Sequence, residues 1–137
     1  MKRIFSPDSW MIQEGLTFIR IIIGLLMIYH GWEVFDKAKM GEYATWESFN
    51  NYASPAIMVY IGKGAELIAG VLLALGLFTR IAAVILIVTM LYICFNVGNG
   101  RFWYEDQHPF LFALIGLIYF FAGGGKYSMD NILFRKN

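Results

Sequence analysis

The sequence predicts an all-α membrane protein whose helices cross the bilayer four times. Its 137 residues are 58% hydrophobic and only 15% charged, a balance that a water-soluble domain of this size does not need. The apolar residues come in long runs without turn signals, and a helix of about 20 apolar residues is long enough to cross a bilayer. We therefore expect residues 1–137 to form a single transmembrane domain, a polytopic four-helix bundle.

The first span is expected over residues 16–35, with the sequence LTFIRIIIGLLMIYHGWEVF. Ser6 followed by Pro7 is typical of a helix start, with the serine as cap and the proline at the first position. No small-residue cleavage site follows the span, so we do not expect a removable signal peptide.

Residues 36–54 are polar and aromatic and carry too many charges to cross the membrane. Thr45 could cap a short helix in which Trp46, Phe49 and Tyr52 recur at near-helical spacing. Aromatic side chains of this kind favour the headgroup layer. We therefore expect a short interfacial helix lying on the membrane between spans one and two.

The second span, residues 55–77, carries Lys63 and Glu66 near its middle. Three residues apart in a helix, the two side chains lie on one face. A charge at this depth costs about 2.5–3.5 kcal/mol, so this face should turn away from lipid. Small residues recur every four positions on the same face, which lets a neighbouring backbone approach it: Gly62, Gly70 and Ala74.

The last two spans are expected over residues 80–96 and 108–122, after a tight connection at Thr79 and Arg80. The loop between them contains turn-forming glycines, and Gly123–Gly125 ends the fourth span. Ser128 is a candidate cap for a final short helix. The single cysteine, Cys94, lies in an apolar run, which indicates a core residue and excludes an internal disulfide.

Four spans would place both termini on one side of the membrane. The basic residues are more numerous on that side (Lys2, Arg3, Arg80, Lys126, Arg135 and Lys136) than on the other (Lys37, Lys39 and Arg101). By the positive-inside rule this distribution favours cytoplasmic termini. We expect a multi-pass protein of a bacterial cytoplasmic (inner) membrane.

This topology brings polar side chains of three spans to similar depth in the outer half of the membrane: His30, Glu33, Lys63, Glu66 and His108. We expect them to form a pocket ringed by Tyr29, Trp32 and Trp103. Arg20 lies in the inner half, where Glu66 and Asp130 are the available anions, and we assign Arg20 and Asp130 a structural role. A structural reading stays open for the pocket too, because Lys63 and Glu66 could simply neutralise each other.

Several classes of chemistry have no motif in this sequence. There is no HExxH, CxxC, GxSxG or Gly-rich phosphate loop, and no basic run that indicates nucleic-acid binding. His30 and His108 could in principle be axial haem ligands, but no haem-binding motif accompanies them. We therefore expect neither a metal site nor haem, and a self-contained catalytic motif is absent.

Several segments together resemble the DoxX family. They are Arg20, the Tyr29-His30-Gly31 turn, Lys63-Gly64-Ala65-Glu66, the run from Gly70 through Gly76 to Thr79-Arg80, and Gly123-Gly124-Gly125-Lys126-Tyr127-Ser128-Met129-Asp130. The resemblance implies a four-helix protein of the bacterial inner membrane. The family name comes from a quinone-reducing thiosulfate oxidoreductase, and other members are associated with oxidative and thiol stress. Many members carry a lysine a few residues after the His-Gly pair, where this chain has Glu33 and then Lys37.

The leading functional hypothesis is a membrane subunit of a redox system that binds a quinone or similar lipophilic substrate in the outer-half pocket. Quinones take up protons with electrons, and His30 and Glu66 are the expected proton-handling residues. The remaining pocket residues would bind the substrate: Tyr29, Trp32, Glu33, Lys63, Trp103 and His108. A protein partner would deliver electrons, or the chain would form a homo-oligomer. The alternative is a non-catalytic membrane protein, either a small transporter or an assembly subunit.

Overall fold

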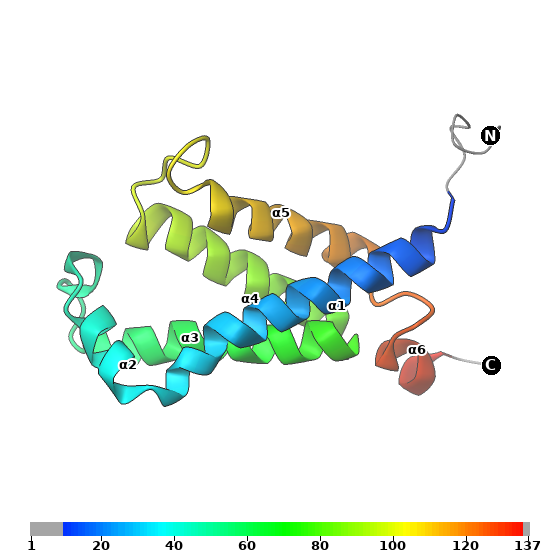
Figure 1. Cartoon of the computed structure of the whole chain (residues 1–137), viewed down its shortest axis with the longest axis horizontal. Helices are drawn as coiled ribbons and strands as arrows, with labels where there is room; N and C mark the ends of the chain where they lie inside the picture. The colour runs from blue at the N-terminus through cyan, green and yellow to red at the C-terminus, as the bar shows by residue number, and fades with distance from the viewer. Residues whose placement is uncertain (1–9, 136–137) are drawn as a thin grey trace.

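A computed structural model describes residues 10–135, which are all-helical and contain no strand (Figure 1). This confirms the predicted fold class at the level of all-α. Four long helices lie side by side: α1 (Ile12–Gly31), α3 (Pro55–Leu75), α4 (Thr79–Tyr92) and α5 (Gln107–Ala122). The shorter elements are η1 (Trp32–Phe35), α2 (Lys37–Ala44), η2 (Glu47–Phe49), the π-helical turn η3 (Ile93–Val97) and α6 (Met129–Phe134).

Three of the long helices have the length and apolarity that a membrane crossing requires. Together with the turns that extend them, they cover Ile12–Phe35, Pro55–Leu75 and Thr79–Val97, which are 24, 21 and 19 residues long. The fourth, α5, has 16 residues and is equally apolar but shorter. The chain is therefore a membrane protein by composition and helix length. At about 1.5 Å per residue, α5 falls short of the roughly 30 Å hydrocarbon core.

Small residues bring α1 and α3 into close contact. A Cβ added to Gly70 would lie 2.7 Å from the backbone nitrogen of Ile28 and 2.8 Å from the carbonyl oxygen of Gly24. A Cβ on Gly24 would meet the backbone of Ala74 at 2.5 Å. The small residues that recur every four positions on α3 thus let the backbones of α1 and α3 approach so closely that no side chain fits between them. Small residues have the same effect in other pairs of membrane helices. Gly62, at the other end of the repeat, faces open space.

The main core lies where α1, α3, α4 and α5 meet. Its buried members are Ile23, Met27, Ala69, Leu73, Ala82, Ala83, Leu86, Met90, Phe112, Ala113 and Tyr119. Tyr119 on α5 donates a hydrogen bond of 2.6 Å to the carbonyl oxygen of Leu16, which ties α5 to the beginning of α1. Cys94 is free and buried, as the apolar run around it predicts.

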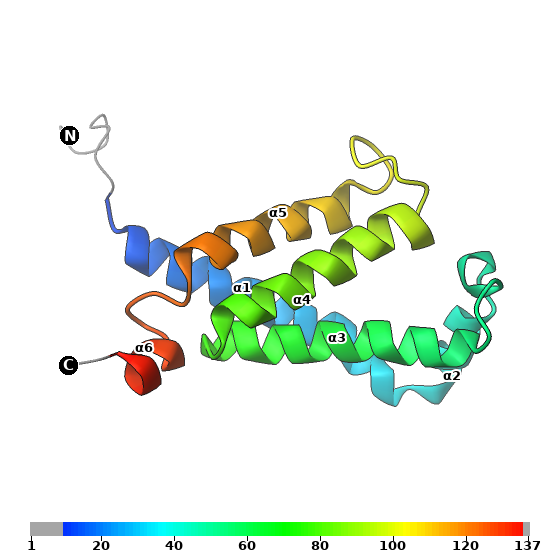
Figure 2. The same ribbon diagram turned by 180° about the vertical axis from the view of Figure 1, so that it is seen from behind.

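Residues 37–53 fold over one end of the long helices, and we call them the cover segment. Figures 1 and 2 show α2 and η2 at the end opposite to α6. The apolar residues Met40 and Phe49 pack against Val59 of α3 in a second core. The prediction of a helix capped by Thr45 is wrong: the helix lies upstream, because Asp36 caps it by accepting hydrogen bonds from the Ala38 and Lys39 amides.

The opposite end of the molecule, which carries α6, is held together by a buried arginine. Arg20 of α1 is 1% exposed and donates to the carbonyl oxygens of Leu73 and Tyr127, both at 2.8 Å. The predicted anionic partners of Arg20, Glu66 and Asp130, are not bonded to it. Backbone carbonyls replace them. α3 ends beside Arg20, at Leu75, and the Leu73 carbonyl near its end accepts from Arg20 as well as from the Gly76 amide.

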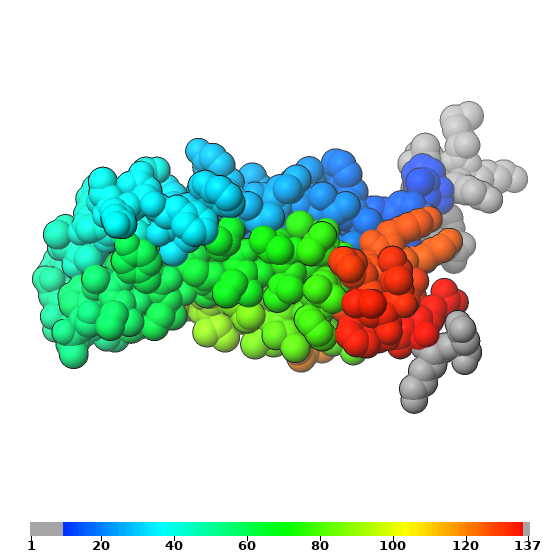
Figure 3. Space-filling model, turned by 90° about the horizontal axis from the view of Figure 1, so that it is seen from below, coloured from blue at the N-terminus to red at the C-terminus, as the bar shows by residue number. Residues whose placement is uncertain are grey.

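Asp130 instead caps the start of α4. Its carboxylate accepts hydrogen bonds from the amides of Phe78, at 2.6 Å, and Thr79, at 2.9 Å. Thr79 is therefore the first residue of α4 rather than part of a connection. Ser128 caps α6 by accepting from the Asn131 amide, as the sequence predicts. Figure 3 shows α6 on the end of the bundle, next to the ends of α1 and α3.

The predicted spans match the helices to within a few residues. Residues 16–35, 55–77, 80–96 and 108–122 correspond to α1 with η1, α3, α4 with η3, and α5. Pro55 is the first residue of α3, although the Ser54 side chain makes no capping hydrogen bond. The predicted Ser6–Pro7 helix start and the basic residues Lys2, Arg3 and Lys136 lie outside the described residues.

Candidate functional site

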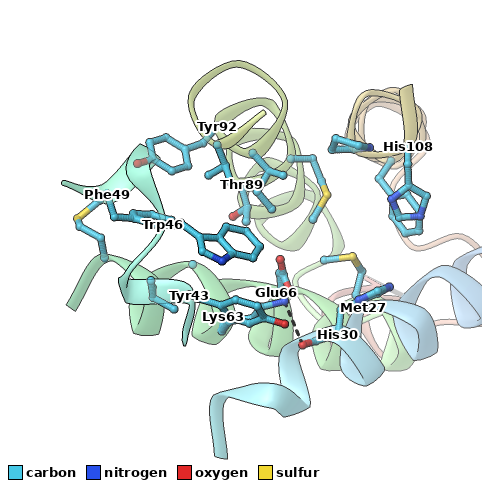
Figure 4. A pocket seen from close by; sticks show the side chains of 18 residues that line it. Met27, His30, Tyr43, Trp46, Phe49, Lys63, Glu66, Thr89, Tyr92 and His108 are labelled. Carbon is cyan, nitrogen blue, oxygen red and sulfur yellow. Dashed lines mark hydrogen bonds and ion pairs between the residues drawn. The ribbon is translucent and has the colours of Figure 1, made fainter. Parts of the chain in front are cut away.

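A half-open cavity of about 260 Å³ lies beneath the cover segment, between α1, α3, α4 and α5 (Figure 4). Its walls are mostly apolar or aromatic, with a few polar side chains on one part of the surface. The lining residues are Met27, His30, Tyr43, Trp46, Phe49, Met58, Val59, Gly62, Lys63, Glu66, Thr89, Met90, Tyr92, Ile93, Val97, His108, Pro109 and Phe112. An apolar cavity of about 150 Å³ holds benzene, so this one has room for a larger ring system.

Lys63 of α3 stands between two carboxylates. Its ammonium lies 3.0 Å from Glu66, one turn further along α3, and 3.0 Å from Glu33 of η1. It also approaches the carbonyl oxygen of His30 at 3.4 Å. The predicted pair of Lys63 and Glu66 is thus part of a larger group, in which α3 is joined to the end of α1. Glu66 is 4% exposed and forms part of the cavity wall.

Glu33 connects this group to the cover segment. One carboxylate oxygen accepts a hydrogen bond of 2.9 Å from Lys39, and the other accepts one of 3.0 Å from the hydroxyl of Tyr43. Burial, and then the hydrogen bond to Glu33, raise the pKa of Tyr43, so its hydroxyl is held in the protonated form. The hydrogen bond that Lys39 donates to Glu33, and then the negative charge of Glu33, raise the pKa of Lys39. The Lys63 ammonium also lies 5.5 Å from the centre of the Tyr43 ring.

The two histidines of the chain lie close together at one side of the cavity. The ring centres of His30 on α1 and His108 on α5 are 6.2 Å apart, and the planes are inclined at 64°. His108 also lies against Phe112, with ring centres 4.8 Å apart. Figure 4 shows both imidazoles on the same side of the cavity, beyond Met27. A polar atom of a ligand placed between the rings could hydrogen-bond to both.

The three aromatic residues that were predicted to surround the pocket do not do so. Tyr29, Trp32 and Trp103 are 75%, 62% and 66% exposed, and none of them lines the cavity. On a helix of 3.6 residues per turn, neighbours of the inward-facing His30 point to other sides. Tyr29 and Trp32 line a shallow outer groove instead, and Trp103 packs edge-on against Phe102 in the loop before α5.

The aromatic residues that line the cavity come mainly from the cover segment. Tyr43, Trp46 and Phe49 belong to it, and Tyr92 belongs to α4. Sequence reasoning assigned Trp46 and Phe49 to the membrane surface and did not consider Tyr43 or Tyr92. The available signal was Tyr92 itself, one of the few polar side chains in a mostly apolar span, because its hydroxyl needs a hydrogen-bond partner when buried.

Two contacts hold the cover segment over the cavity. The hydroxyls of Tyr52 and Tyr92 are 2.6 Å apart, and the Ser48 hydroxyl donates to the carbonyl oxygen of Val97 at 3.0 Å. Both join the cover segment to the end of α4 and η3. Together with the Tyr43–Glu33 hydrogen bond, they fasten the cover segment on both sides of the cavity.

The donor groups of the site suit an organic ligand better than a metal. Within residues 10–135, no group of three or more His, Cys, Asp or Glu side chains is close enough to bind a metal ion. His30, His108 and Glu66 instead present single polar atoms to a largely apolar space. Such a combination is typical of small-molecule sites, in which apolar walls give affinity and a few polar groups fix orientation.

Two known proteins are similar to this chain over most of its length. The chain is 33% identical to an uncharacterized protein of Haemophilus influenzae over 128 residues, which cover 88% of this chain and 92% of that protein. It is 27% identical over 122 residues to CatD of Bacillus subtilis, whose name proposes that it is an oxidoreductase, with 88% of each chain covered. No solved structure gives a significant match.

The model of one protein family matches residues 15–99, which include α1, the cover segment, α3 and α4. The matched region holds Arg20, His30, Glu33, Lys63 and Glu66. The chain belongs to the DoxX family.

Proposed function

We propose that this protein is the membrane subunit of a redox system and binds the head group of a quinone, or a similar lipophilic ring, in the cavity beneath the cover segment. The observation that carries this proposal is the composition of the cavity wall. Flat aromatic side chains and the imidazole and carboxyl groups of His30, His108 and Glu66 line the same cavity. A quinone ring needs both kinds of contact.

His30 would handle the proton. Reduction of a quinone consumes two electrons and two protons, and oxidation of the quinol releases them. Imidazole exchanges protons near neutral pH, and His30 is partly buried at the cavity, with the second imidazole 6.2 Å away. One quinone oxygen placed between the rings would be hydrogen-bonded by both. Glu66, further inside, would tune and resupply the proton.

Electrons would come from a partner protein of the membrane or of the cytoplasm. The proposed activity of the Bacillus subtilis relative, as its name gives it, belongs to the same class of chemistry. In this proposal α5 is a fourth, short span, both termini are cytoplasmic, and the membrane is the bacterial inner membrane. The cover segment and the cavity would then lie on the outer side.

A structural role has one observation in its favour. The ion pairs of Lys63 with Glu33 and Glu66 join α1 to α3 and leave no unpaired cation there. Such a group could serve only to orient helices. The cavity beside the ion pairs favours the binding proposal, because a purely structural group of charges needs no cavity next to it.

Binding is tested by filling the cavity from a position that has room. A Cβ on Gly62 meets nothing within 4 Å, and Gly62 lines the cavity. Gly64 on the same helix has equal room but does not line it. We expect the wild type in nanodiscs to bind the tailless naphthoquinone menadione, Gly62→Phe to bind it about tenfold more weakly or worse, and Gly64→Phe to resemble the wild type.

The acid–base role is tested separately with His30→Gln. Glutamine keeps hydrogen bonding but cannot exchange a proton at neutral pH. We expect the variant to be as abundant in membranes as the wild type and to bind menadione, but to lose most complementation of a deletion strain. Full complementation would remove His30 from the mechanism. If Gly62→Phe and Gly64→Phe both bound menadione as tightly as the wild type, the cavity would not be the binding site.

A further inference from the structure

The charged side chains next to the cavity form an unbroken line that leads out of it. Glu66 contacts Lys63 at 3.0 Å, Lys63 contacts Glu33 at 3.0 Å, and Glu33 contacts Lys39 at 2.9 Å. Tyr43 adds a hydroxyl that donates to Glu33 at 3.0 Å. Every step is within hydrogen-bonding distance, so no water is needed to complete the chain.

Exposure to solvent rises at each step of this line. The side chain of Glu66 is 5% exposed, that of Lys63 17%, that of Glu33 21% and that of Lys39 49%. One end therefore lies in the cavity wall and the other on the exposed surface of α2. A pair that only neutralised charge would not need the two outer members, because Lys63 and Glu66 already balance each other.

We propose that Glu66, Lys63 and Glu33 form a proton path between the cavity and the aqueous side on which α2 lies. The proposal rests on the proposed function, since it concerns the protons that a bound quinone exchanges. During quinol oxidation, a proton passes from His30 or the ligand to Glu66, while the Lys63 ammonium gives its proton to Glu33. Lys63 then takes the proton of Glu66, and Glu33 releases its own to water. No atom or charge is left over, and reduction runs the same steps in reverse.

The test of the path uses a substitution of Lys63, the residue between Glu66 and Glu33. A lysine ammonium gives up its proton more easily when a carboxylate beside it is neutralised, as Glu66 is when it receives the proton from the cavity, because loss of that negative charge lowers the lysine pKa. An arginine guanidinium keeps its proton in proteins but can pair with two carboxylates equally well. Lys63→Arg therefore preserves the charge and the ion pairs with Glu33 and Glu66 while it blocks the transfer.

The experiment follows reduction of protein-bound menadione in nanodiscs by dithionite, using stopped-flow absorbance in H₂O and in D₂O. With menadione at a concentration that saturates each protein, we expect Lys63→Arg and Glu33→Gln to form the quinol about tenfold or more slowly than the wild type. We expect the wild-type rate to fall in D₂O. Glu42→Gln, an exposed carboxylate of α2 outside the line, is the matched control and should react at the wild-type rate.

The outcomes separate the path from the proposed function. If the wild type does not bind menadione, the proposed function fails and the path has no substrate. If the wild type binds but Lys63→Arg reacts at the wild-type rate, protons reach the cavity by another route and the path is refuted. Should Lys63→Arg fail to fold, Glu33→Gln decides alone, because a wild-type rate in that variant also refutes the path.

Discussion

Lys63 has two carboxylates within 3.0 Å, and this changes what each single substitution should do. The sequence indicates a pair with Glu66, in which either change leaves the other charge exposed to an apolar environment. With Glu33 present, loss of Glu66 still leaves Lys63 paired. Loss of Lys63 leaves Glu66, which is 4% exposed, without its hydrogen-bond donor.

We therefore expect Lys63→Met to destabilise the protein by about 3–5 kcal/mol, the usual cost of leaving a buried charge unpaired. Glu66→Gln should cost about 1 kcal/mol, because the amide keeps a hydrogen bond to Lys63. The double variant Lys63→Met/Glu66→Met should recover most of the loss. Thermal unfolding in detergent, followed by circular dichroism, measures all three. Equal stability of Lys63→Met and the wild type would indicate that Glu66 is hydrated or protonated.

The polar members of the site were predictable, and its aromatic members were not. His30, Lys63 and Glu66 interrupt apolar spans, and a polar group at that depth must face protein or a cavity. An aromatic side chain is not restricted in this way, because it can lie in lipid, among the headgroups or in a protein core. Tyr29 and Trp32 thus face outward, whereas Trp46 faces the cavity.

Among the elements, α1 and α3 form the closest pair, because their facing positions hold glycine and alanine. The position of long helices follows from apolar length and from Pro and Gly at their ends, so their bounds were predictable to a few residues. The path of the cover segment was not, because it depends on Met40 and Phe49 packing against Val59, which lies outside the segment. Local spacing favoured a helix after Thr45 and carried no information on that contact.

The α1–α3 contact predicts a large difference between two glycines of the same helix. Gly70→Ala would place a methyl group 2.7 Å from the Ile28 nitrogen, and neither backbone can easily move. We expect a loss of at least about 1–3 kcal/mol, as in overpacked cores. Gly64→Ala has open space around it and should be neutral or slightly stabilising, because alanine is the better helix former. Detergent melting curves of both variants measure this difference, and similar curves would contradict the packing.

At the scale of the whole molecule, the two ends have different character. One end carries α6, the beginning of α1 and the Arg20 contacts, and the other carries the cover segment and the loop before α5 (Figure 1). If α5 crosses the membrane, these ends lie on opposite sides of it. The even number of crossings then puts residue 50 and the carboxyl terminus in different compartments.

Reporter fusions test this arrangement directly. Fusion after Asn50, an exposed residue of the cover segment, should report the outer side, and fusion after Asn137 should report the cytoplasm. The matched pair is informative because the positive-inside bias is the main basis for the orientation. A cytoplasmic signal at Asn50 would reverse the proposed orientation. If Asn137 then reported the outer side, the proposed proton release would occur in the cytoplasm.

The contacts of Arg20 also set an order for biogenesis. Its two acceptors are separated from it by 53 and 107 positions along the chain, so the guanidinium enters the membrane before either acceptor does. The first helix must be inserted with this charge uncompensated and must wait for Leu73 and then Tyr127. The carboxyl-terminal segment is therefore the last part of the chain needed to satisfy a charge in the first helix. Cellular quality control could recognise an incomplete chain by that exposed arginine.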